Sequence, residues 1–174
     1  PKRYNSRAIA GLISDAKNEL MGPADFAQTV KNQFDEIVAE VFTHYQKRLS
    51  SANALDFDDL ISRTVELLQR HPEIRAKYRS RFKHILVDEY QDTNHAQYIL
   101  IRELVGTSFD GFPMAELCVV GDSDQSIYAF RGANIRNILQ FEDDFPDATT
   151  VLLEQNYRST QNILSAANAV ISNN

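Results

Sequence analysis

The sequence has a single cysteine, only six glycines and no long apolar run. One cysteine excludes an intrachain disulfide framework and favours a reducing cytosol. Because Cys118 lies inside an apolar run, we expect a buried, unreactive side chain. No segment reaches the roughly 20 apolar residues of a membrane-spanning helix, and no signal-peptide pattern is present. The four histidines show no metal-ligand spacing, so no metal is assigned to them.

Charge is distributed unevenly along the 174 residues. Residues 1–83 hold 14 Lys and Arg against 11 Asp and Glu, whereas residues 84–174 hold 4 against 13. The net charge of −6 argues weakly against a nucleic-acid partner, but the distribution matters more. Six basic residues gather within residues 70–83, which indicates either a solvated helix face or a contact with a phosphate backbone.

The first 83 residues have the periodicity of helices. Apolar residues at steps of three and four over residues 26–49 predict one helix about 38 Å long. The Met21-Gly22-Pro23 segment separates it from an earlier helix over residues 7–20. A third helix is expected over residues 58–69, with Asp56 as its N-cap.

From residue 84 onward, short apolar runs alternate with helical patterns. The runs at residues 85–87, 117–120 and 151–153 are expected strands, and helices are expected over residues 94–105 and from about residue 159. The second of these helices should turn Ile163 and Val170 inward. Apolar strands alternating with helices predict an α/β fold with a parallel sheet covered on both faces. Ligands of such sheets bind at the carboxyl ends of the strands.

The most specific string is V-D-E-Y-Q-D-T-N, residues 87–94, at the end of the first expected strand. A carboxylate such as Asp88 at a strand tip can hold Mg²⁺, and a second, Glu89, can orient or deprotonate an attacking water in phosphoryl transfer. Two adjacent carboxylates repel each other, and a bound cation would offset that repulsion. An acidic turn is the simpler interpretation of the bare pair.

Two further strings follow later strands. In G-D-S-D-Q-S-I-Y-A-F-R-G-A, residues 121–133, the neutral amide of Gln125 suits contact with a phosphate oxygen and a water together. Tyr128, Phe130 and Arg131 set aromatic faces beside a cation, a combination that can stack bases and hold a backbone phosphate. An ordinary loop with core aromatics is the alternative.

The third string is L-E-Q-N-Y-R-S-T, residues 153–160. Tyr157 has a face that can stack on a purine, and the forked guanidinium of Arg158 can grip a terminal phosphate. Asn156 and Ser159 are candidate supporting or capping groups. A Tyr-Arg pair is more often an ordinary surface pair, so this string alone is weak.

Together and in this order, the three strings resemble motifs II, III and IV of superfamily 1 DNA helicases of the UvrD/Rep/PcrA type. The segments L-D-F-D-D-L-I, residues 55–61, and A-K-N-E-L, residues 16–20, extend the resemblance along nearly the whole chain. The resemblance implies ATP and Mg²⁺ as cofactors and single-stranded and duplex DNA as partners. It also implies an ATP hydrolase that moves 3′→5′ on DNA.

The resemblance also implies a role for each site residue. Asp88 would help coordinate the ATP-bound Mg²⁺ beside Glu89, the catalytic base, and Gln125 would couple the γ-phosphate to the DNA contacts. Tyr157 would stack on adenine, and Arg158 would reach the γ-phosphate as an arginine finger. The residues expected to face single-stranded DNA are Tyr128, Phe130 and Arg131. Phe130 stands where relatives often have Trp, which offers a larger stacking face.

The implied architecture is a partial RecA-like P-loop NTPase sheet with an all-helical insert. Residues 1–50 would be the insert, which lies against the duplex, residues 51–148 part of the first motor domain, and residues 149–174 the start of the second. None of the six glycines is followed by Lys, so the G-x-x-x-x-G-K-[ST] phosphate loop is missing. With Pro1 first and the later helicase motifs absent, we expect an internal piece of a longer protein, inactive alone.

Three functional interpretations stay open on the sequence. The first is a DNA helicase of the bacterial cytosol, associated with the nucleoid and with unidentified repair or replication proteins. The second is the motor of a helicase–nuclease from the same superfamily. The third is a non-catalytic DNA-binding module. A phosphate loop upstream in the same reading frame would distinguish a motor from a module.

Overall fold

The computed structural model describes residues 4–106, 114–129 and 132–172. Its longer helices are α1 (Ser6–Asn18), α2 (Pro23–Gln28), α3 (Gln33–Ser51), α4 (Phe57–Arg70), α5 (Pro72–Arg81), α6 (His95–Val105) and α9 (Gln161–Ile171). The shorter elements are α7 (Arg136–Leu139), α8 (Phe141–Asp144), the strands β1 (His84–Val87) and β2 (Glu116–Val119), and the 3₁₀ turns η1 (Tyr90–Asp92) and η2 (Ser123–Gln125). In the described part of the chain, no helix combines the length and the apolarity that crossing a membrane requires.

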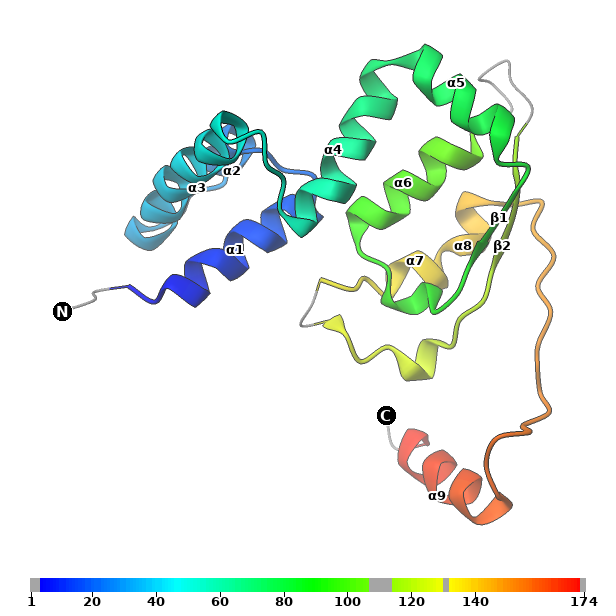
Figure 1. Cartoon of the computed structure of the whole chain (residues 1–174). Coiled ribbons are helices and arrows are strands. Elements are labelled where there is room, and N and C mark those ends of the chain that lie inside the picture. The colour runs from blue at the N-terminus through cyan, green and yellow to red at the C-terminus, as the bar shows by residue number, and fades with distance from the viewer. Residues whose placement is uncertain (1–3, 107–113, 130–131, 173–174) are drawn as a thin grey trace.

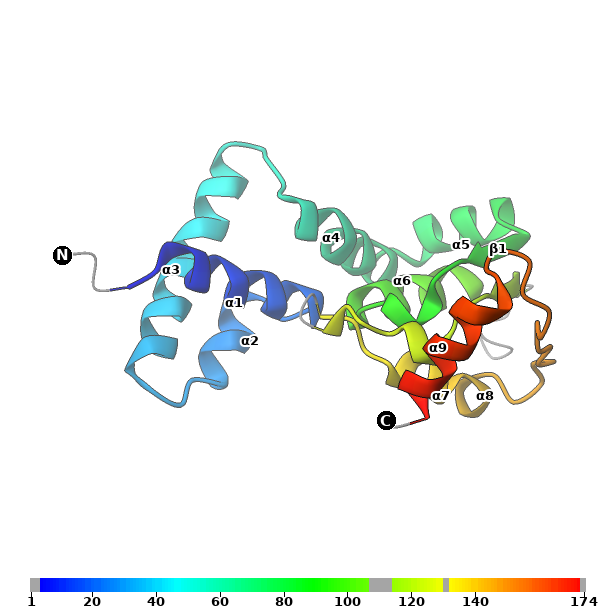
Figure 2. The same ribbon diagram turned by 90° about the horizontal axis from the view of Figure 1, so that it is seen from below.

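Figure 1 shows three parts: the α1–α3 helices, a central body of α4–α8 with the sheet, and α9 apart from both. Figure 2, the view from below, again places the α1–α3 helices at one end of the molecule. Helix α1 packs on α3 and also contacts α4 and α6 of the central body, so it links the two parts.

The single helix expected over residues 26–49 is wrong, because the chain breaks between α2 and α3. Asn32 is the N-cap of α3, and its side chain accepts hydrogen bonds from the amides of Phe34 and Asp35. The apolar spacing nevertheless marked a real core. Phe26 of α2 packs edge-on against Phe42 of α3, with ring centroids 6.2 Å apart. The core continues into α1 through Ile13, Ala16 and neighbouring apolar side chains.

The expected third helix is confirmed as α4, with Asp56 as its N-cap. The Asp56 side chain accepts the Asp59 amide hydrogen at 2.8 Å, and the Asp59 carboxylate accepts the Asp56 amide hydrogen in return. The early helix expected over residues 7–20 is also confirmed, as α1.

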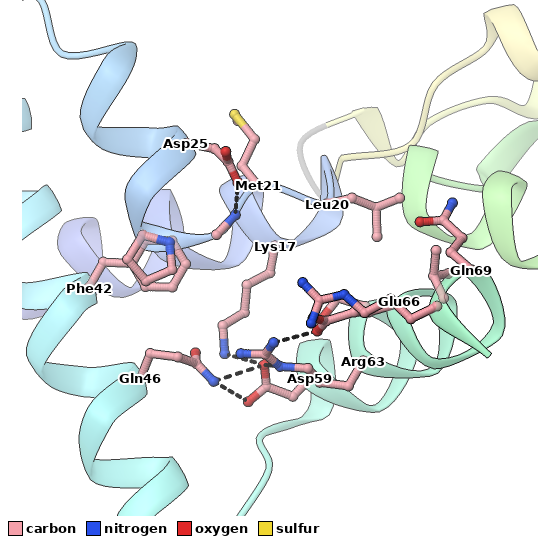
Figure 3. A pocket seen from close by; sticks show the side chains of 15 residues that line it. Lys17, Leu20, Met21, Asp25, Phe42, Gln46, Asp59, Arg63, Glu66 and Gln69 are labelled. Carbon is pink, nitrogen blue, oxygen red and sulfur yellow. Dashed lines mark hydrogen bonds and ion pairs between the residues drawn. The ribbon is translucent and has the colours of Figure 1, made fainter.

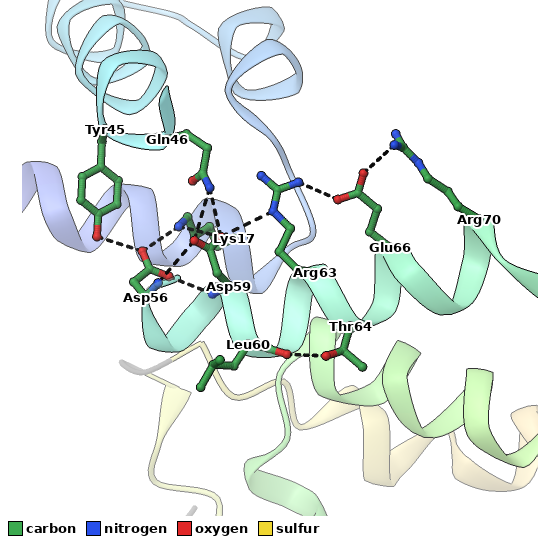
Figure 4. Close-up of polar contacts among 10 residues, drawn as sticks. All are labelled: Lys17, Tyr45, Gln46, Asp56, Asp59, Leu60, Arg63, Thr64, Glu66 and Arg70. Atoms are coloured by element: carbon green, nitrogen blue, oxygen red, sulfur yellow. Dashed lines mark hydrogen bonds and ion pairs between the residues drawn. The ribbon is translucent and has the colours of Figure 1, made fainter. Parts of the chain in front are cut away.

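A buried ion-pair network joins α1, α3 and α4 (Figure 4). The Lys17 Nζ lies 2.6 Å from Asp56 Oδ2 and 2.9 Å from Asp59 Oδ1. The side chains of Lys17 and Asp59 are only 3% and 2% exposed. From α3, Gln46 donates to the Asp59 carboxylate and the Tyr45 hydroxyl donates to Asp56 at 2.9 Å. The network thus ties both α1 and α3 to the start of α4.

The basic residues of α5 are partly committed to contacts within the chain. Arg79 is buried and its Nε donates to the Glu103 carbonyl at 2.7 Å. Arg75 lies 3.0 Å from the Glu103 carboxylate. Arg70, the last residue of α4, instead pairs with Glu66 of the same helix at 2.9 Å. Part of the basic stretch at residues 70–83 therefore docks α5 on α6 instead of forming an open cationic face.

The two strands form a parallel sheet, as the sequence predicted, with Leu86 opposite Cys118. One face packs on α6, α7 and α8 through alternate strand residues, namely Ile85, Val87, Leu117 and Val119. The other face is open: Leu86 is 76% exposed, and Cys118 and Val120 are exposed as well. The expectations of a sheet covered on both faces and of a buried Cys118 are therefore wrong for the described residues. Side chains alternate between faces along a strand, and in the described residues one face alone has a helical layer.

The third expected strand, residues 151–153, is also wrong. These residues take no helical or strand conformation, and Leu153 is 83% exposed. They belong to the long segment that leads to α9 (Figure 1). The helix itself forms as expected, but Ile163 and Val170 do not point into a core, and none of its residues is buried. Among the described residues, β1 and β2 pair only with each other, so no strand satisfies the backbone groups of the run at residues 151–153.

We expect Lys17→Met to destabilise the fold by about 3 kcal/mol, because it removes the close cationic partner of buried Asp59 and leaves only Arg63 at 3.8 Å. Urea unfolding monitored by circular dichroism measures this change. Lys47→Met is the matched control, since Lys47 is exposed on α3; we expect a change within about 0.5 kcal/mol. Equal effects of the two substitutions would contradict the structural role of Lys17.

The network also predicts a pH dependence. Burial acts to raise the pKa of Asp56, but hydrogen bonds from Lys17, the Asp59 backbone and Tyr45 outweigh it and lower that pKa. A lowered folded-state pKa stabilises the fold above the unfolded value of about 3.9, and this contribution disappears as the pH falls through the folded pKa. The free-energy difference between wild type and Asp56→Asn should therefore shrink between pH 7 and pH 3. A constant difference would refute the ionised role of Asp56.

Candidate functional site

The carboxyl ends of β1 and β2 lie side by side, and backbone hydrogen bonding continues beyond the strands. The Val120 amide donates to the Val87 carbonyl at 2.8 Å, and the Tyr90 amide donates to the Val120 carbonyl at 3.0 Å. These bonds place residues 88–92 next to residues 121–125. Two of the strings singled out in the sequence therefore meet at one edge of the sheet, where parallel sheets bind ligands.

Asp88 and Glu89 are exposed at the tip of β1. Glu89 has φ 50° and ψ 43°, the left-handed region that a residue with a side chain adopts at a cost of about 1–3 kcal/mol. The Glu89 amide donates to Asp88 Oδ1 at 2.9 Å, which occupies one carboxylate oxygen of Asp88. Strain of this kind is held by its surroundings and is common at functional sites.

Gln91 lies beneath this turn with its side chain directed at both strand tips. It is 1% exposed. Its Nε2 donates to Glu89 Oε2 at 2.7 Å and to Asp92 Oδ2 at 3.3 Å, while its Oε1 accepts the Asp122 amide hydrogen at 3.0 Å. Gln91 therefore bridges the turn after β1 and the turn after β2.

Gln125 extends the same set of contacts on the β2 side. Its Nε2 donates to Asp122 Oδ2 at 2.6 Å, and Asp122 caps η2 by accepting the Asp124 amide hydrogen. The two sequence-predicted residues Glu89 and Gln125 are thus joined through Gln91 and Asp122. Our sequence reasoning missed Gln91. The available signal was its place as an uncharged amide between the acidic side chains of Glu89 and Asp92.

The turn after β1 is anchored by a buried aromatic side chain. Tyr90 is fully buried and meets the Phe141 ring edge-on, with centroids 5.5 Å apart. Burial raises the pKa of Tyr90 to about 12, so the hydroxyl stays neutral at physiological pH. Next to it, the Asn137 side-chain amide donates to the Thr93 carbonyl and hydroxyl at 3.1 and 3.0 Å. These contacts fix the backbone that carries Asp88 and Glu89.

Asn94 connects the site to the α1–α3 helices. Its side chain caps α6 by accepting the Gln97 amide hydrogen at 2.9 Å. Its Nδ2 also donates to Asn18 Oδ1 at 3.0 Å, a contact across 76 residues of sequence. Asn18 belongs to the A-K-N-E-L segment, so that segment and V-D-E-Y-Q-D-T-N touch in the structure.

Two cavities are candidates for a ligand. One of about 420 Å³ adjoins the strand tips and is lined by Asp88, Glu89, Asp92 and apolar residues of α4 and α6. Another, of about 370 Å³, lies between α1, α2, α3 and α4 (Figure 3). In the second, Arg63 and Arg70 both pair with Glu66. Only the strand-tip cavity borders the two carboxylates that the sequence indicated.

The donor set at the strand tip fits Mg²⁺ better than a transition metal. Within residues 4–106, 114–129 and 132–172, no three or more His, Cys, Asp or Glu side chains gather closely enough to enclose a metal ion. Mg²⁺ is commonly held by one or two carboxylates together with substrate phosphates. Asp88 and Glu89, two adjacent exposed carboxylates, offer that kind of incomplete set.

The remaining predicted residues do not meet the strand tips. Tyr157 is 92% exposed and Arg158 is exposed too, in the segment before α9. No hydrogen bond or ion pair in the described part of the chain joins either one to Glu89 or Gln125. The Asn156 side chain accepts the Arg158 and Ser159 amide hydrogens, both at 2.9 Å, so it holds a local turn. It does not cap α9, whose N-cap is Thr160.

The predicted DNA contacts are only partly visible. Tyr128 is 38% exposed and follows η2 in the chain. Phe130 and Arg131 lie outside the described residues. The roles of all these side chains stay predictions.

Gly121 permits the close approach of the two turns. A Cβ at this position would lie 2.7 Å from Gln91 Oε1 and 2.8 Å from Ile138 Cδ1. We expect Gly121→Ala to destabilise the fold by about 1–3 kcal/mol through overpacking. Gly11→Ala is the control, because nothing lies within 4 Å of its added Cβ in α1; we expect it to stabilise by about 0.5–1 kcal/mol. Thermal unfolding compares the two, and a neutral Gly121→Ala would contradict the tight contact.

Comparisons with known proteins agree with the motifs. Residues 1–146 match the family described as UvrD/REP helicase N-terminal domain. A protein of Mycobacterium tuberculosis named ATP-dependent DNA helicase UvrD1 is 63% identical over 177 aligned residues, which cover 99% of this chain. A protein of Bacillus subtilis named ATP-dependent DNA helicase PcrA is 52% identical over the whole chain.

The chain spans 23% of the length of each of these two relatives. The family match nevertheless covers most of the chain and includes both strings that meet at the strand tips. The chain therefore belongs to the UvrD/REP helicase N-terminal domain family.

Proposed function

We propose that this chain is part of an ATP-dependent DNA helicase that couples ATP hydrolysis to 3′→5′ translocation on single-stranded DNA and to duplex unwinding. The observation that carries the proposal is the parallel pairing of β1 and β2, which brings Asp88 and Glu89 beside Asp122 and Gln125. The names of the relatives, ATP-dependent DNA helicases, support the same activity.

In this proposal the two strand-tip carboxylates divide the chemistry. Asp88 would hold the ATP-bound Mg²⁺, directly or through water. Glu89 accepts a proton from the water that attacks the γ-phosphorus, and ADP departs as the bond to its β-phosphate oxygen breaks. When bound, Mg²⁺ supplies positive charge against the phosphate oxygens.

Gln125, Tyr157 and Arg158 complete the proposed nucleotide site. Gln125 senses the γ-phosphate, Tyr157 stacks on adenine, and Arg158 reaches the γ-phosphate from the second motor domain. The exposure of Tyr157 and Arg158 supports this division, because a finger residue must approach from a separate body. A guanidinium fork matches the geometry of a terminal phosphate.

The proposed architecture keeps the domain boundaries that the family resemblance implies. The described part of the sheet contributes two strands to it. Residues 51–148 form part of a RecA-like motor domain, residues 1–50 its helical insert, and residues 149–174 the start of the second motor domain. Tyr128, Phe130 and Arg131 hold single-stranded DNA by stacking and charge. We place the parent protein in the bacterial cytosol, associated with the nucleoid.

In the longer protein, we expect Glu89→Gln to reduce kcat for DNA-stimulated ATP hydrolysis by about 10²–10⁴-fold, because it removes the base. ATP binding, measured with a fluorescent analogue, should stay nearly unchanged. The control is Glu116→Gln, since Glu116 sits at the opposite end of β2 beside His84. Undiminished hydrolysis by Glu89→Gln would refute the assignment of the base.

The isolated chain should show no measurable DNA-stimulated ATPase activity. Its sequence has no G-K-[ST] loop, so it has no loop amides and Lys to cradle the β- and γ-phosphates. Phosphate release measured with and without single-stranded DNA tests this expectation. Turnover that Glu89→Gln abolishes would show that the chain hydrolyses ATP alone.

A further inference from the structure

The geometry points to Gln91 as a positioning residue of ATP hydrolysis, which holds the Glu89 carboxylate in a fixed place relative to the turn after β2. This inference rests on the proposed function, because it gives Gln91 a part in the same reaction. Gln91 does not touch a reacting atom in this account. It acts through Glu89 on one side and through Asp122 and Gln125 on the other.

The hydrogen bonds of the Gln91 amide determine its orientation. Both Nε2 hydrogens point to carboxylates, Glu89 Oε2 at 2.7 Å and Asp92 Oδ2 at 3.3 Å, and Oε1 faces the Asp122 amide at 3.0 Å. If the amide were flipped, its oxygen would face the carboxylates of Glu89 and Asp92, and its NH₂ group would face the N–H of Asp122. The donors of Gln91 are fully used, and an amide that is 1% exposed finds no water to replace them.

The bond to Glu89 resists a competing conformation of that side chain. Glu89 itself is exposed, and an exposed carboxylate otherwise samples several rotamers. The 2.7 Å contact to a buried amide restricts it to rotamers that keep Oε2 above Gln91. The other oxygen, Oε1, remains available to accept a proton from water. A neutral donor also restrains the carboxylate without the ion pair that a cationic residue would make.

The bond to Asp122 connects the Glu89 position to the turn that holds Gln125. Asp122 accepts from Gln125 Nε2 at 2.6 Å, and its own amide donates to Gln91. A shift of the η2 turn therefore moves Gln91 and, through it, the Glu89 carboxylate. Gly121 keeps this path short, since a side chain there would meet Gln91 Oε1 at 2.7 Å. If Gln125 senses the γ-phosphate, the same path aligns the base when nucleotide is bound.

Two substitutions in the longer protein separate the two ends of Gln91. Gln91→Glu keeps an acceptor for the Asp122 amide but replaces the donor to Glu89 with a third carboxylate. Gln91→Met keeps the length of the side chain and loses both bonds. We expect each to lower kcat for DNA-stimulated ATP hydrolysis by about 10²-fold, the effect of a misplaced catalytic group. The KM for ATP should change by less than about threefold, because neither variant alters a nucleotide contact.

The split between kcat and KM distinguishes positioning from general structural damage. A misplaced Glu89 carboxylate lowers kcat while the KM for ATP stays close to wild type, whereas a disrupted fold changes both. The matched control is Gln69→Glu, which makes the same change beside another glutamate, since exposed Gln69 donates to Glu103 on the surface. It should retain the wild-type kcat and KM.

The outcomes separate the inference from the proposed function. A wild-type protein without ATPase activity would overturn both. Wild-type activity together with a Gln91→Glu kcat that matches that of Gln69→Glu would overturn the inference alone. Melting temperatures identify a variant that unfolds, and if Gln91→Met unfolds, the kcat and KM of Gln91→Glu decide the question.

Discussion

The parallel hydrogen-bonded pairing of β1 with β2 is the constraint on which the site depends. It extends past the strands through the Tyr90 amide and the Val120 carbonyl, so two turns separated by about 30 residues meet at one edge. Parallel pairing in this register sets both carboxyl ends at the same level. Without this pairing, Gln91 could not bond to Asp122, and Glu89 and Gln125 would not be connected through these two residues.

A second constraint is electrostatic and lies away from the strand tips. Lys17 satisfies two carboxylates at the start of α4, and the adjacent Asn18 bonds to Asn94 at the start of α6. One turn of α1 thus contacts both the ion-pair network and the capping residue after the V-D-E-Y-Q-D-T-N turn. The packing of the α1–α3 helices and the geometry of the site are therefore linked through α1. In the proposed motor, that link would join the insert to the ATP site.

The sequence predicted the features that local chemistry determines. Asp56 is the N-cap that the sequence indicated, its side chain satisfying a free amide of α4, and the parallel pairing followed from apolar runs that alternate with helices. The sequence-based expectations were wrong where the burial of a side chain depends on another surface packing against it. Cys118 and residues 151–153 are apolar, yet in the described residues no layer covers them. Gln91 was missed because its importance comes from Asp122, which is remote in sequence and adjacent only once the strands pair.

The most direct test of this account is a crystal structure of the longer protein with Mg²⁺ and a non-hydrolysable ATP analogue. The account predicts Mg²⁺ bound to Asp88, at about 2.0–2.1 Å or through one water. It also predicts a water within hydrogen-bonding distance of Glu89 and in line with the γ-phosphate, with the Gln91 bond to Glu89 intact. A nucleotide bound away from the tips of β1 and β2, with neither carboxylate near its phosphates or metal, would contradict it.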